Sequence, residues 1–112
     1  MTVGLVVVTY ESAALVRRLV EAIAAQTRRP DRVLVVDNGS RDATVDTLRQ
    51  AFAATTLPVE VVALDRNTGF AAANNLAVAR LDDCAAVVLL NPDAFPEPAW
   101  LATLEAAAVR HP

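Results

Sequence analysis

The sequence predicts an α/β fold, a three-layer sandwich in which helices cover both faces of a mostly parallel, four-stranded sheet. Four short apolar runs alternate with four segments whose apolar residues recur at helical spacing. The runs hardly alternate with polar residues, which is typical of strands covered on both faces and therefore of parallel sheets. Three of the runs end directly in a polar tip. Because parallel sheets bind ligands beyond the carboxyl ends of their strands, we expect a functional site at these tips.

The composition favours a single folded domain without affinity for nucleic acid. The chain has 112 residues, of which 54% are apolar, so we expect one aliphatic core and one domain over residues 1–112. Its formal net charge is -3, and its ten cationic residues are all arginines that form no basic stripe. The absence of lysine excludes a Walker-type phosphate site and Schiff-base chemistry.

Three further features favour a reducing, aqueous compartment. Cys84 is the only cysteine and cannot form an internal disulfide. The longest apolar runs have the length of a strand, well below the roughly 18 residues that cross a bilayer. The first residues also lack the charged start of a signal peptide. We therefore expect a cytoplasmic protein.

The first unit of the predicted sheet is a strand followed by a helix. Val3–Val8 is an apolar run and ends in the polar tip Thr9–Glu11. Ser12 is a residue type that caps helices, and Pro30 ends the helical segment before the next strand. The helix itself is predicted by apolar residues at intervals of four: Leu15, Leu19 and Ile23.

The second unit delivers a carboxylate to the edge of the sheet. Val33–Val36 leads straight into Asp37, and Asn38–Ser40 follows as a loop. A second helix is expected to begin near Asp42 or Ala43, since aspartate is a good cap. The apolar residues of this helix stand three and four apart: Val45, Leu48 and Phe52.

The third unit is expected at the side of the sheet. Val59–Leu64 is the least hydrophobic strand and carries Glu60, a charge typical of edge strands. The loop Asp65–Gly69 and an alanine-rich helix over Phe70–Leu81 follow it. This helix has a thin apolar stripe, which consists of Phe70, Ala73, Ala77 and Leu81.

The fourth unit ends in a second acidic tip. Ala86–Leu90 is an apolar run that leads into Asn91–Asp93. Pro98 is expected in the first turn of a last helix, where proline is well tolerated. The apolar residues of that helix are Leu101, Leu104 and Ala108.

Two carboxylates at the tips suit a nucleotide site. Uracil and thymine each present one N–H donor between two carbonyl groups, and Asp37 could accept that hydrogen bond for about 1.5–3 kcal/mol. Asp93 could hold Mg²⁺ or Mn²⁺ against a diphosphate, which supplies the charge that no lysine here provides. If the strands are parallel neighbours, Glu11 lies at the same edge of the sheet.

Four blocks of sequence together resemble a known family. In chain order they are Thr9–Glu11, Val35–Ser40 with Asp42, Arg66–Ala71 and Leu89–Ala94. The chain resembles the donor-binding half of a family 2 glycosyltransferase with the GT-A fold, and most of all the rhamnosyltransferase-like branch. The resemblance covers nearly the whole chain in the right order. It implies a Rossmann-like domain that binds a nucleotide sugar.

The resemblance also implies roles for single residues. The positions that match nucleotide-binding residues of the family are Thr9, Tyr10, Glu11, Asp37, Asn67 and Gly69. Asp93 matches the last carboxylate of the family's Asp-x-Asp metal motif, so the expected cofactor is Mg²⁺ or Mn²⁺. The motif begins here with Asn91, which contributes a neutral oxygen ligand at best.

The same resemblance implies a reaction that this chain completes only as part of a longer enzyme. In the family, the acceptor-binding half and its general base follow the matched region, so no catalytic residue is assigned here. The whole enzyme would transfer a sugar, with inversion, from a UDP- or dTDP-sugar to a saccharide or lipid-linked acceptor at the inner face of the membrane, in cell-envelope polysaccharide synthesis. We expect the isolated chain to bind the donor and to transfer nothing. A homodimer through an exposed sheet edge is a further expectation left open.

Other functions fit the pattern less well. A phosphoacceptor receiver module has the same size but needs a lysine that this chain lacks. A dinucleotide oxidoreductase needs a Gly-x-Gly-x-x-Gly motif, which follows none of the predicted strands. The chain could also bind a nucleotide without catalysing a reaction.

Several candidate residues also have purely structural interpretations. Glu11 could be merely solvated, and Asp37 could only cap a helix. Asn67 with Gly69 could form a plain turn. The amides of Asn74–Asn75 could reach the donor phosphates or only satisfy backbone carbonyls.

Overall fold

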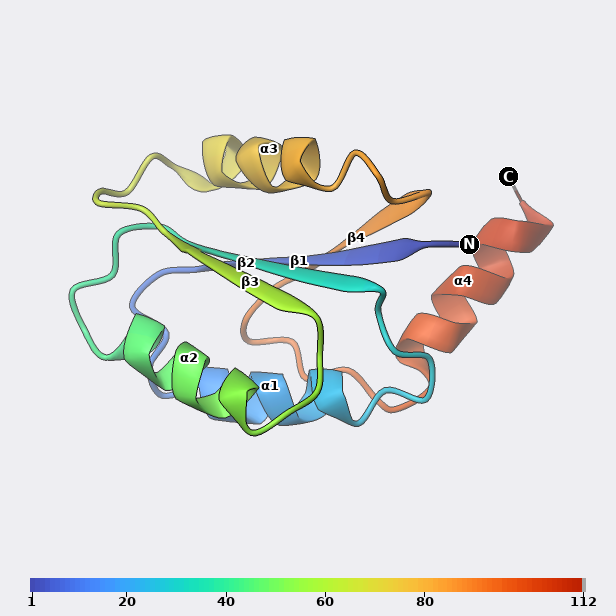
Figure 1. Ribbon diagram of the computed structural model, residues 1–112, viewed down its shortest axis with the longest axis horizontal. Coiled ribbons are helices and arrows are strands. Elements are labelled where there is room, and N and C mark those ends of the chain that lie inside the picture. Colours follow the sequence, from blue (N-terminus) through green and yellow to red (C-terminus); the bar gives the residue numbers. More distant parts are fainter. Residues whose placement is uncertain (112) are drawn as a thin grey trace.

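The computed structural model describes residues 1–111 and confirms the predicted α/β fold, with strands and helices in strict alternation (Figure 1). The strands are β1 (Val3–Thr9), β2 (Arg32–Asp37), β3 (Val59–Ala63) and β4 (Ala86–Leu90). The helices are α1 (Val16–Ala24), α2 (Thr44–Ala53), α3 (Phe70–Arg80) and α4 (Trp100–Arg110). Every predicted element is present, and only the ends differ, by a few residues.

The sheet has the strand order β3-β2-β1-β4, and all three pairings are parallel. The chain moves outward from β1 to β2 and β3 and then returns to the other side of β1 for β4, so the order reverses between β1 and β4. This is the order at the start of a Rossmann fold, whereas receiver modules follow the order 2-1-3-4-5. The receiver alternative is therefore wrong.

Helices cover the two faces of the sheet unequally. Figure 1 shows α3 on one face and α1 with α2 on the other, while α4 lies beyond the end of the sheet where the chain starts. Leu19 and Ile23 of the predicted stripe are buried in the core together with Val16 and Val20, whereas Leu15 precedes α1 and is only half-buried. A fully buried aliphatic side chain of this size stabilises the fold by about 1.5–3 kcal/mol.

The placement of Val59–Ala63 at the edge of the sheet is confirmed. Glu60 on this strand is exposed, and its Oε2 lies 3.1 Å from Nη1 of Arg80. The opposite edge, β4, carries no charged residue, and Leu89 on it is half exposed. None of the helices in residues 1–111 has the length and the apolar character that crossing a bilayer requires.

Of the two predicted helix caps, Ser12 acts differently from the expectation and Asp42 acts as expected. The hydroxyl of Ser12 donates to the carbonyl oxygen of Tyr10 instead of capping, and α1 begins only at Val16 after a turn. Asp42 does accept a hydrogen bond from the backbone N–H of Thr44, the first residue of α2, at 3.0 Å. Serine satisfied a nearer backbone group, as short polar side chains often do.

Three apolar assignments on the later helices are wrong. Phe70 is 60% exposed and does not join the buried stripe of α3. On α4, Leu101 is buried, whereas Leu104 and Ala108 are exposed because the helix projects beyond the sheet. Pro98 was expected in the first turn of α4 but lies in the turn before this helix. Its carbonyl oxygen accepts a hydrogen bond from the backbone N–H of Thr27.

Candidate functional site

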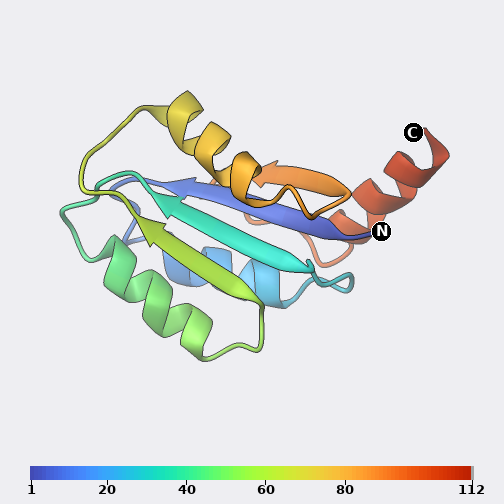
Figure 2. The ribbon, with the colours of Figure 1, turned by 45° about the horizontal axis from the view of Figure 1, so that its top comes forward.

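The polar tips lie along one edge of the sheet, as predicted. Thr9 at the end of β1 pairs in register with Asp37 at the end of β2, and Asp37 pairs with Ala63 at the end of β3. On the other side of β1, Leu90 at the end of β4 pairs with Val7. Figure 2 shows that the arrowheads of the strands point to the same side of the molecule.

Asp37 is the buried anchor of this edge. It is 1% exposed, and its Oδ1 accepts hydrogen bonds from the hydroxyls of Thr9 at 2.8 Å and Ser40 at 2.7 Å. Its Oδ2 accepts one from the backbone N–H of Ser40 at 2.8 Å. A carboxylate oxygen has two lone pairs, so Oδ2 keeps capacity for one further donor.

Glu11 joins the loop after β1 to the loop after β2. Its carboxylate accepts hydrogen bonds from the backbone N–H groups of Arg41 at 3.2 Å and Asp42 at 3.1 Å. Its own N–H donates to the hydroxyl of Ser40 at 2.8 Å. Glu11 has a φ of 49°, a left-handed conformation that is uncommon for residues other than glycine. Glu11 therefore organises the tips and is not merely solvated.

The tips also carry fixed negative charge. The hydrogen bond from the hydroxyl of Thr44 lowers the pKa of Asp42 below its ordinary value, and the backbone N–H of Thr44 adds to this effect. Asp42 is therefore ionised at neutral pH, next to the carboxylate of Glu11. A diphosphate at this edge would need a cation or arginine to offset that charge.

Asn38 connects the loop after β2 to the loop after β3. Its amide donates to the carbonyl oxygen of Gly69 at 3.1 Å and accepts from the backbone N–H of Thr68 at 2.8 Å. Gly39 has a φ of 82°, and a Cβ there would lie 2.6 Å from the carbonyl carbon of Arg66. The two loops thus pack backbone against backbone.

Asn67 and Gly69 form a local turn, and a contact of either residue with a ligand stays a prediction. The side-chain oxygen of Asn67 accepts from the N–H of Gly69 at 2.8 Å, and Gly69 has a φ of 90°. Asn74 is buried, and its amide donates to the carbonyl oxygen of Phe70 at 3.0 Å. That hydrogen bond gives Asn74 a structural role within α3.

A cleft of about 260 Å³ opens at the point where the strand order reverses. Its lining residues are Val8, Thr9, Tyr10, Ser12, Asn38, Asn67, Phe70 and Pro92. Open α/β sheets bind ligands at this switch point. Tyr10 is 49% and Phe70 60% exposed, so two aromatic rings are available to a ligand.

The cleft includes residues that the sequence did not single out as functional, namely Val8, Ser12, Asn38, Phe70 and Pro92. A signal existed for Asn38, because a polar residue directly after a strand end lies at the ligand-binding edge. Phe70 gave no such signal, because it is apolar and begins α3 after the Gly69 turn. Asp37 does not line the cleft but supports Thr9, which does.

The expected metal ligands lie after β4, on the far side of the cleft from the Asn38 loop. Asn91 and Asp93 are exposed and belong to a turn closed by the N–H of Ala94 on the carbonyl of Asn91 at 3.0 Å. Within residues 1–111, no three His, Cys, Asp or Glu side chains gather closely enough to hold a metal ion. Mg²⁺ is often held by one or two carboxylates together with phosphates and water. Asp93 and Asn91 fit that pattern only when a phosphate completes the shell.

The chain matches the family described as Glycosyl transferase family 2 over residues 5–112. It is 30% identical over 96 residues to the O-antigen chain rhamnosyltransferase RfbN of Salmonella typhimurium, covering 85% of this chain and 29% of RfbN. It is 31% identical over 101 residues to the glycosyltransferase AglE of Haloferax volcanii, covering 88% of this chain and 33% of AglE. The chain thus spans about a third of the length of these curated relatives.

Solved structures share the fold. The mannosyltransferase PcManGT from Pyrobaculum calidifontis, in complex with GDP-Man and Mn²⁺, has a TM-score of 0.78 and 30% identity over 89% of this chain and 30% of its own. TarS of S. aureus in complex with UDP-GlcNAc has a TM-score of 0.83 over 99% of this chain and 32% of its own, and its 24% identity supports the fold alone. The chain therefore belongs to glycosyltransferase family 2 and has the GT-A type of fold.

Proposed function

We propose that residues 1–112 form the donor-binding domain of an inverting glycosyltransferase and bind a UDP- or dTDP-sugar in the cleft beside Tyr10 and Phe70. The observation that carries this proposal is the position of the cleft, at the carboxyl ends of β1 and β4 where the strand order reverses. Related structures with GDP-Man and with UDP-GlcNAc support a nucleotide sugar as ligand.

The pyrimidine ring is proposed to lie near Thr9 and Tyr10, with its N–H directed at Asp37. The free acceptor capacity of Asp37 Oδ2 supports this role. Asp37 is almost fully buried, so only a donor that approaches the end of β2 closely can reach it. Glu11, Asn67 and the Gly69 backbone complete the proposed nucleotide site.

The diphosphate is proposed to lie toward the turn after β4. Asp93 and Asn91 would hold Mg²⁺ or Mn²⁺ there together with phosphate oxygens, and the ion would offset the charge of the diphosphate. The complex of PcManGT with GDP-Man and Mn²⁺ supports a divalent ion in this fold.

The chain alone is proposed to bind the donor without transferring the sugar. Its relatives are about three times as long, and no described residue is assigned as the base that deprotonates the acceptor. In the whole enzyme the acceptor would be a saccharide or lipid-linked saccharide, presented at the inner face of a membrane. The similarity to an O-antigen chain rhamnosyltransferase supports this choice.

Calorimetry with UDP, dTDP and GDP, each with and without Mn²⁺, tests the proposal. We expect UDP and dTDP to bind and Mn²⁺ to tighten both. If GDP binds and neither UDP nor dTDP does, the pyrimidine assignment is wrong. Absence of heat with every nucleotide would overturn the binding proposal. Hydrolysis or transfer of a UDP-sugar by the 112-residue chain would contradict the expected inactivity.

A further inference from the structure

The segment from Asn91 to Ala99 connects the proposed diphosphate site to the opposite end of the molecule. It leaves the carboxyl end of β4 and passes on the α1 side of the sheet to reach α4 (Figure 1). Pro92, Pro96 and Pro98 lie within it. Proline fixes its own φ near -65°, so this segment has few ways to absorb a displacement of either end.

The middle of this segment is held by Phe95. The ring is half-buried and packs against the core between the sheet and α1. The guanidinium carbon of Arg18, on α1, lies 4.0 Å from the ring centroid. A cation over an aromatic face is stabilising, so α1 fixes the segment at this point.

Gln26 holds the far end of the segment. It is 5% exposed, and its Nε2 donates to the carbonyl oxygen of Glu97 at 2.8 Å and to that of Ala22 at 3.2 Å. Its Oε1 accepts from the backbone N–H of Leu101 at 3.0 Å. The N-cap residue of α4 is Ala99, which makes no capping hydrogen bond with its side chain. Gln26 therefore supplies an acceptor to the first turn of α4.

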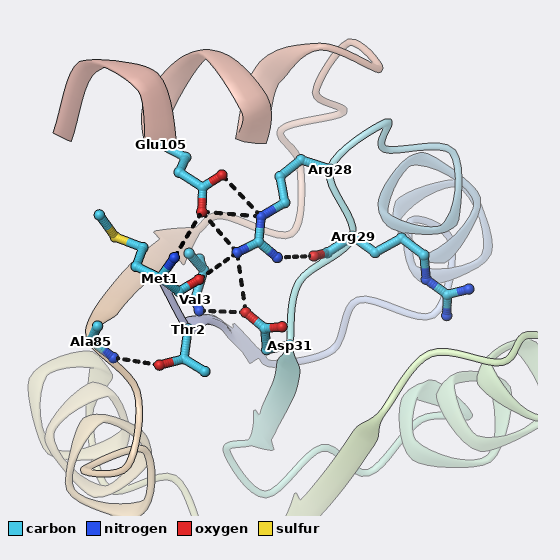
Figure 3. Close-up of polar contacts among 8 residues, drawn as sticks. All are labelled: Met1, Thr2, Val3, Arg28, Arg29, Asp31, Ala85 and Glu105. Atoms are coloured by element: carbon cyan, nitrogen blue, oxygen red, sulfur yellow. Dashed lines mark hydrogen bonds and ion pairs between the residues drawn. The ribbon is translucent and has the colours of Figure 1, made fainter. Parts of the chain in front are cut away.

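The residues that follow Gln26 contact the same end. The N–H of Thr27 donates to the carbonyl oxygen of Pro98 at 2.9 Å. Figure 3 shows Arg28 between Glu105 of α4 and Asp31, with Nη2 2.8 Å from Glu105 Oε2 and 3.1 Å from Asp31 Oδ2. Arg29 turns away from this cluster, and its Nη1 donates to the hydroxyl of Thr56 at 3.0 Å.

We propose that Gln26 is a positioning residue for the Asn91–Asp93 turn and acts through the proline-containing segment 92–98. Gln26 is the only described side chain that hydrogen-bonds both the segment, at Glu97, and the start of α4, at Leu101. Without these bonds the segment would lose its contact at Glu97 and keep the packing of Phe95 and the contact of Pro98 with Thr27, so the turn after β4 would be held less firmly. The effect on ligand binding rests on the proposed role of Asp93.

Backbone amide NMR shifts test the positioning without any ligand. Gln26→Ala is expected to shift or broaden the amide signals of Asn91, Asp93 and Ala94, which lie far from the substituted side chain in sequence. Arg29→Ala is the matched control, because Arg29 contacts Thr56 and not the segment. Unchanged amide signals for Asn91, Asp93 and Ala94 in folded Gln26→Ala would overturn the proposal.

The Mn²⁺ response of UDP binding tests the functional consequence. Wild type and Arg29→Ala are expected to bind UDP more tightly when Mn²⁺ is present. In Gln26→Ala the factor by which Mn²⁺ tightens UDP binding should be about five-fold smaller, and the affinity without metal should be unchanged. An equal gain in Gln26→Ala would overturn the proposal. If wild type itself shows no gain, the metal role of Asp93 fails, and the amide shifts alone decide the positioning.

A second variant guards against unfolding of Gln26→Ala. Arg28→Ala removes the ion pair between Arg28 and Glu105 of α4. Both side chains are partly exposed, so the substitution leaves the core intact. We expect shifts in the same amides, smaller than in Gln26→Ala. Shifts confined to α4 and the first residues of β1 would contradict transmission through the segment.

Discussion

The hydroxyl of Thr9 donates a hydrogen bond to Oδ1 of Asp37 at 2.8 Å, between two residues that also pair in register at the ends of β1 and β2. Both side chains are buried. Hydrogen bonds to charged groups contribute about 1.5–3 kcal/mol, more than most neutral ones. The same carboxylate therefore joins two strands, and its second oxygen, Oδ2, keeps capacity for one further donor.

Asp37→Asn should reduce both the stability of the fold and the affinity for UDP. The amide nitrogen cannot accept from Ser40, so we expect the free energy of unfolding to fall by about 1–3 kcal/mol. We also expect UDP to bind about ten-fold more weakly or worse, because the charged acceptor is lost. Thermal unfolding and calorimetry measure the two effects.

Ser40→Ala is the control for Asp37→Asn. It removes hydroxyl contacts to Asp37 and Glu11 but leaves the carboxylate in place. It should lower stability and change UDP affinity little. If Asp37→Asn bound UDP like wild type, Asp37 would have a structural role only.

Asp93→Ala should abolish the gain in UDP affinity that Mn²⁺ provides and leave metal-free binding unchanged, because a carboxylate is the strongest ligand that the turn after β4 offers. Asp82→Ala, at an exposed aspartate between α3 and β4, is the matched control. Titrations with Mn²⁺ compare the two variants. A full Mn²⁺ response in Asp93→Ala would assign the metal to other groups.

Gly39→Ala and Gly69→Ala should differ although both glycines have a positive φ. A positive φ costs an alanine about 1–2 kcal/mol at Gly39. At Gly69 the cost is about 1–3 kcal/mol, because a ψ of 156° combined with a φ of 90° is a conformation almost exclusive to glycine. At Gly39 the new methyl group would also lie 2.6 Å from the carbonyl carbon of Arg66, whereas nothing lies within 4 Å at Gly69. We expect Gly39→Ala to lower the free energy of unfolding clearly more. Equal losses in chemical denaturation would contradict the predicted order of the two variants.

Phe70→Ala should weaken UDP binding with little loss of stability, since the ring is exposed and lines the cleft. Stacking of a base on an aromatic side chain is worth about 1–3 kcal/mol. Val78→Ala, at an exposed apolar residue on the same helix, is the control. If both variants bind UDP equally well, Phe70 does not contact the nucleotide.

The cluster around Arg28 should make the docking of α4 depend on pH. The hydrogen bond from Arg28 lowers the pKa of Glu105 below its ordinary 4.5, and the backbone N–H of Val3 lowers that of Asp31 below 3.8. Their stabilisation is thus complete above these ordinary values and is lost as the pH falls through the lowered pKa values. Glu105→Gln should flatten the acid limb of the stability curve, and Glu60→Gln, at an exposed ion pair, should not. An unchanged acid limb in Glu105→Gln would contradict this prediction.

Much of the fold and part of the site could be predicted from local pattern. Val33–Val36 followed by Asp37 identifies a buried strand and the carboxylate at its end, because apolar runs and polar tips act over a few residues. The edge position of β3 followed from Glu60. Helix starts were less predictable. Several backbone groups lie within reach of the Ser12 hydroxyl, and it donates to the carbonyl oxygen of Tyr10.

The sequence by itself determined the alternation of strands and helices and the identity of the residues at the strand ends. Only the tertiary structure decided that the strand order reverses between β1 and β4, which places the cleft between Tyr10 and Pro92. It also decided which partner each polar side chain has. Thr9 and Asp37 are 28 residues apart in the chain, and Gln26 and Leu101 are 75 apart. Contacts over such separations depend on how the layers pack, and no periodicity within a segment encodes them.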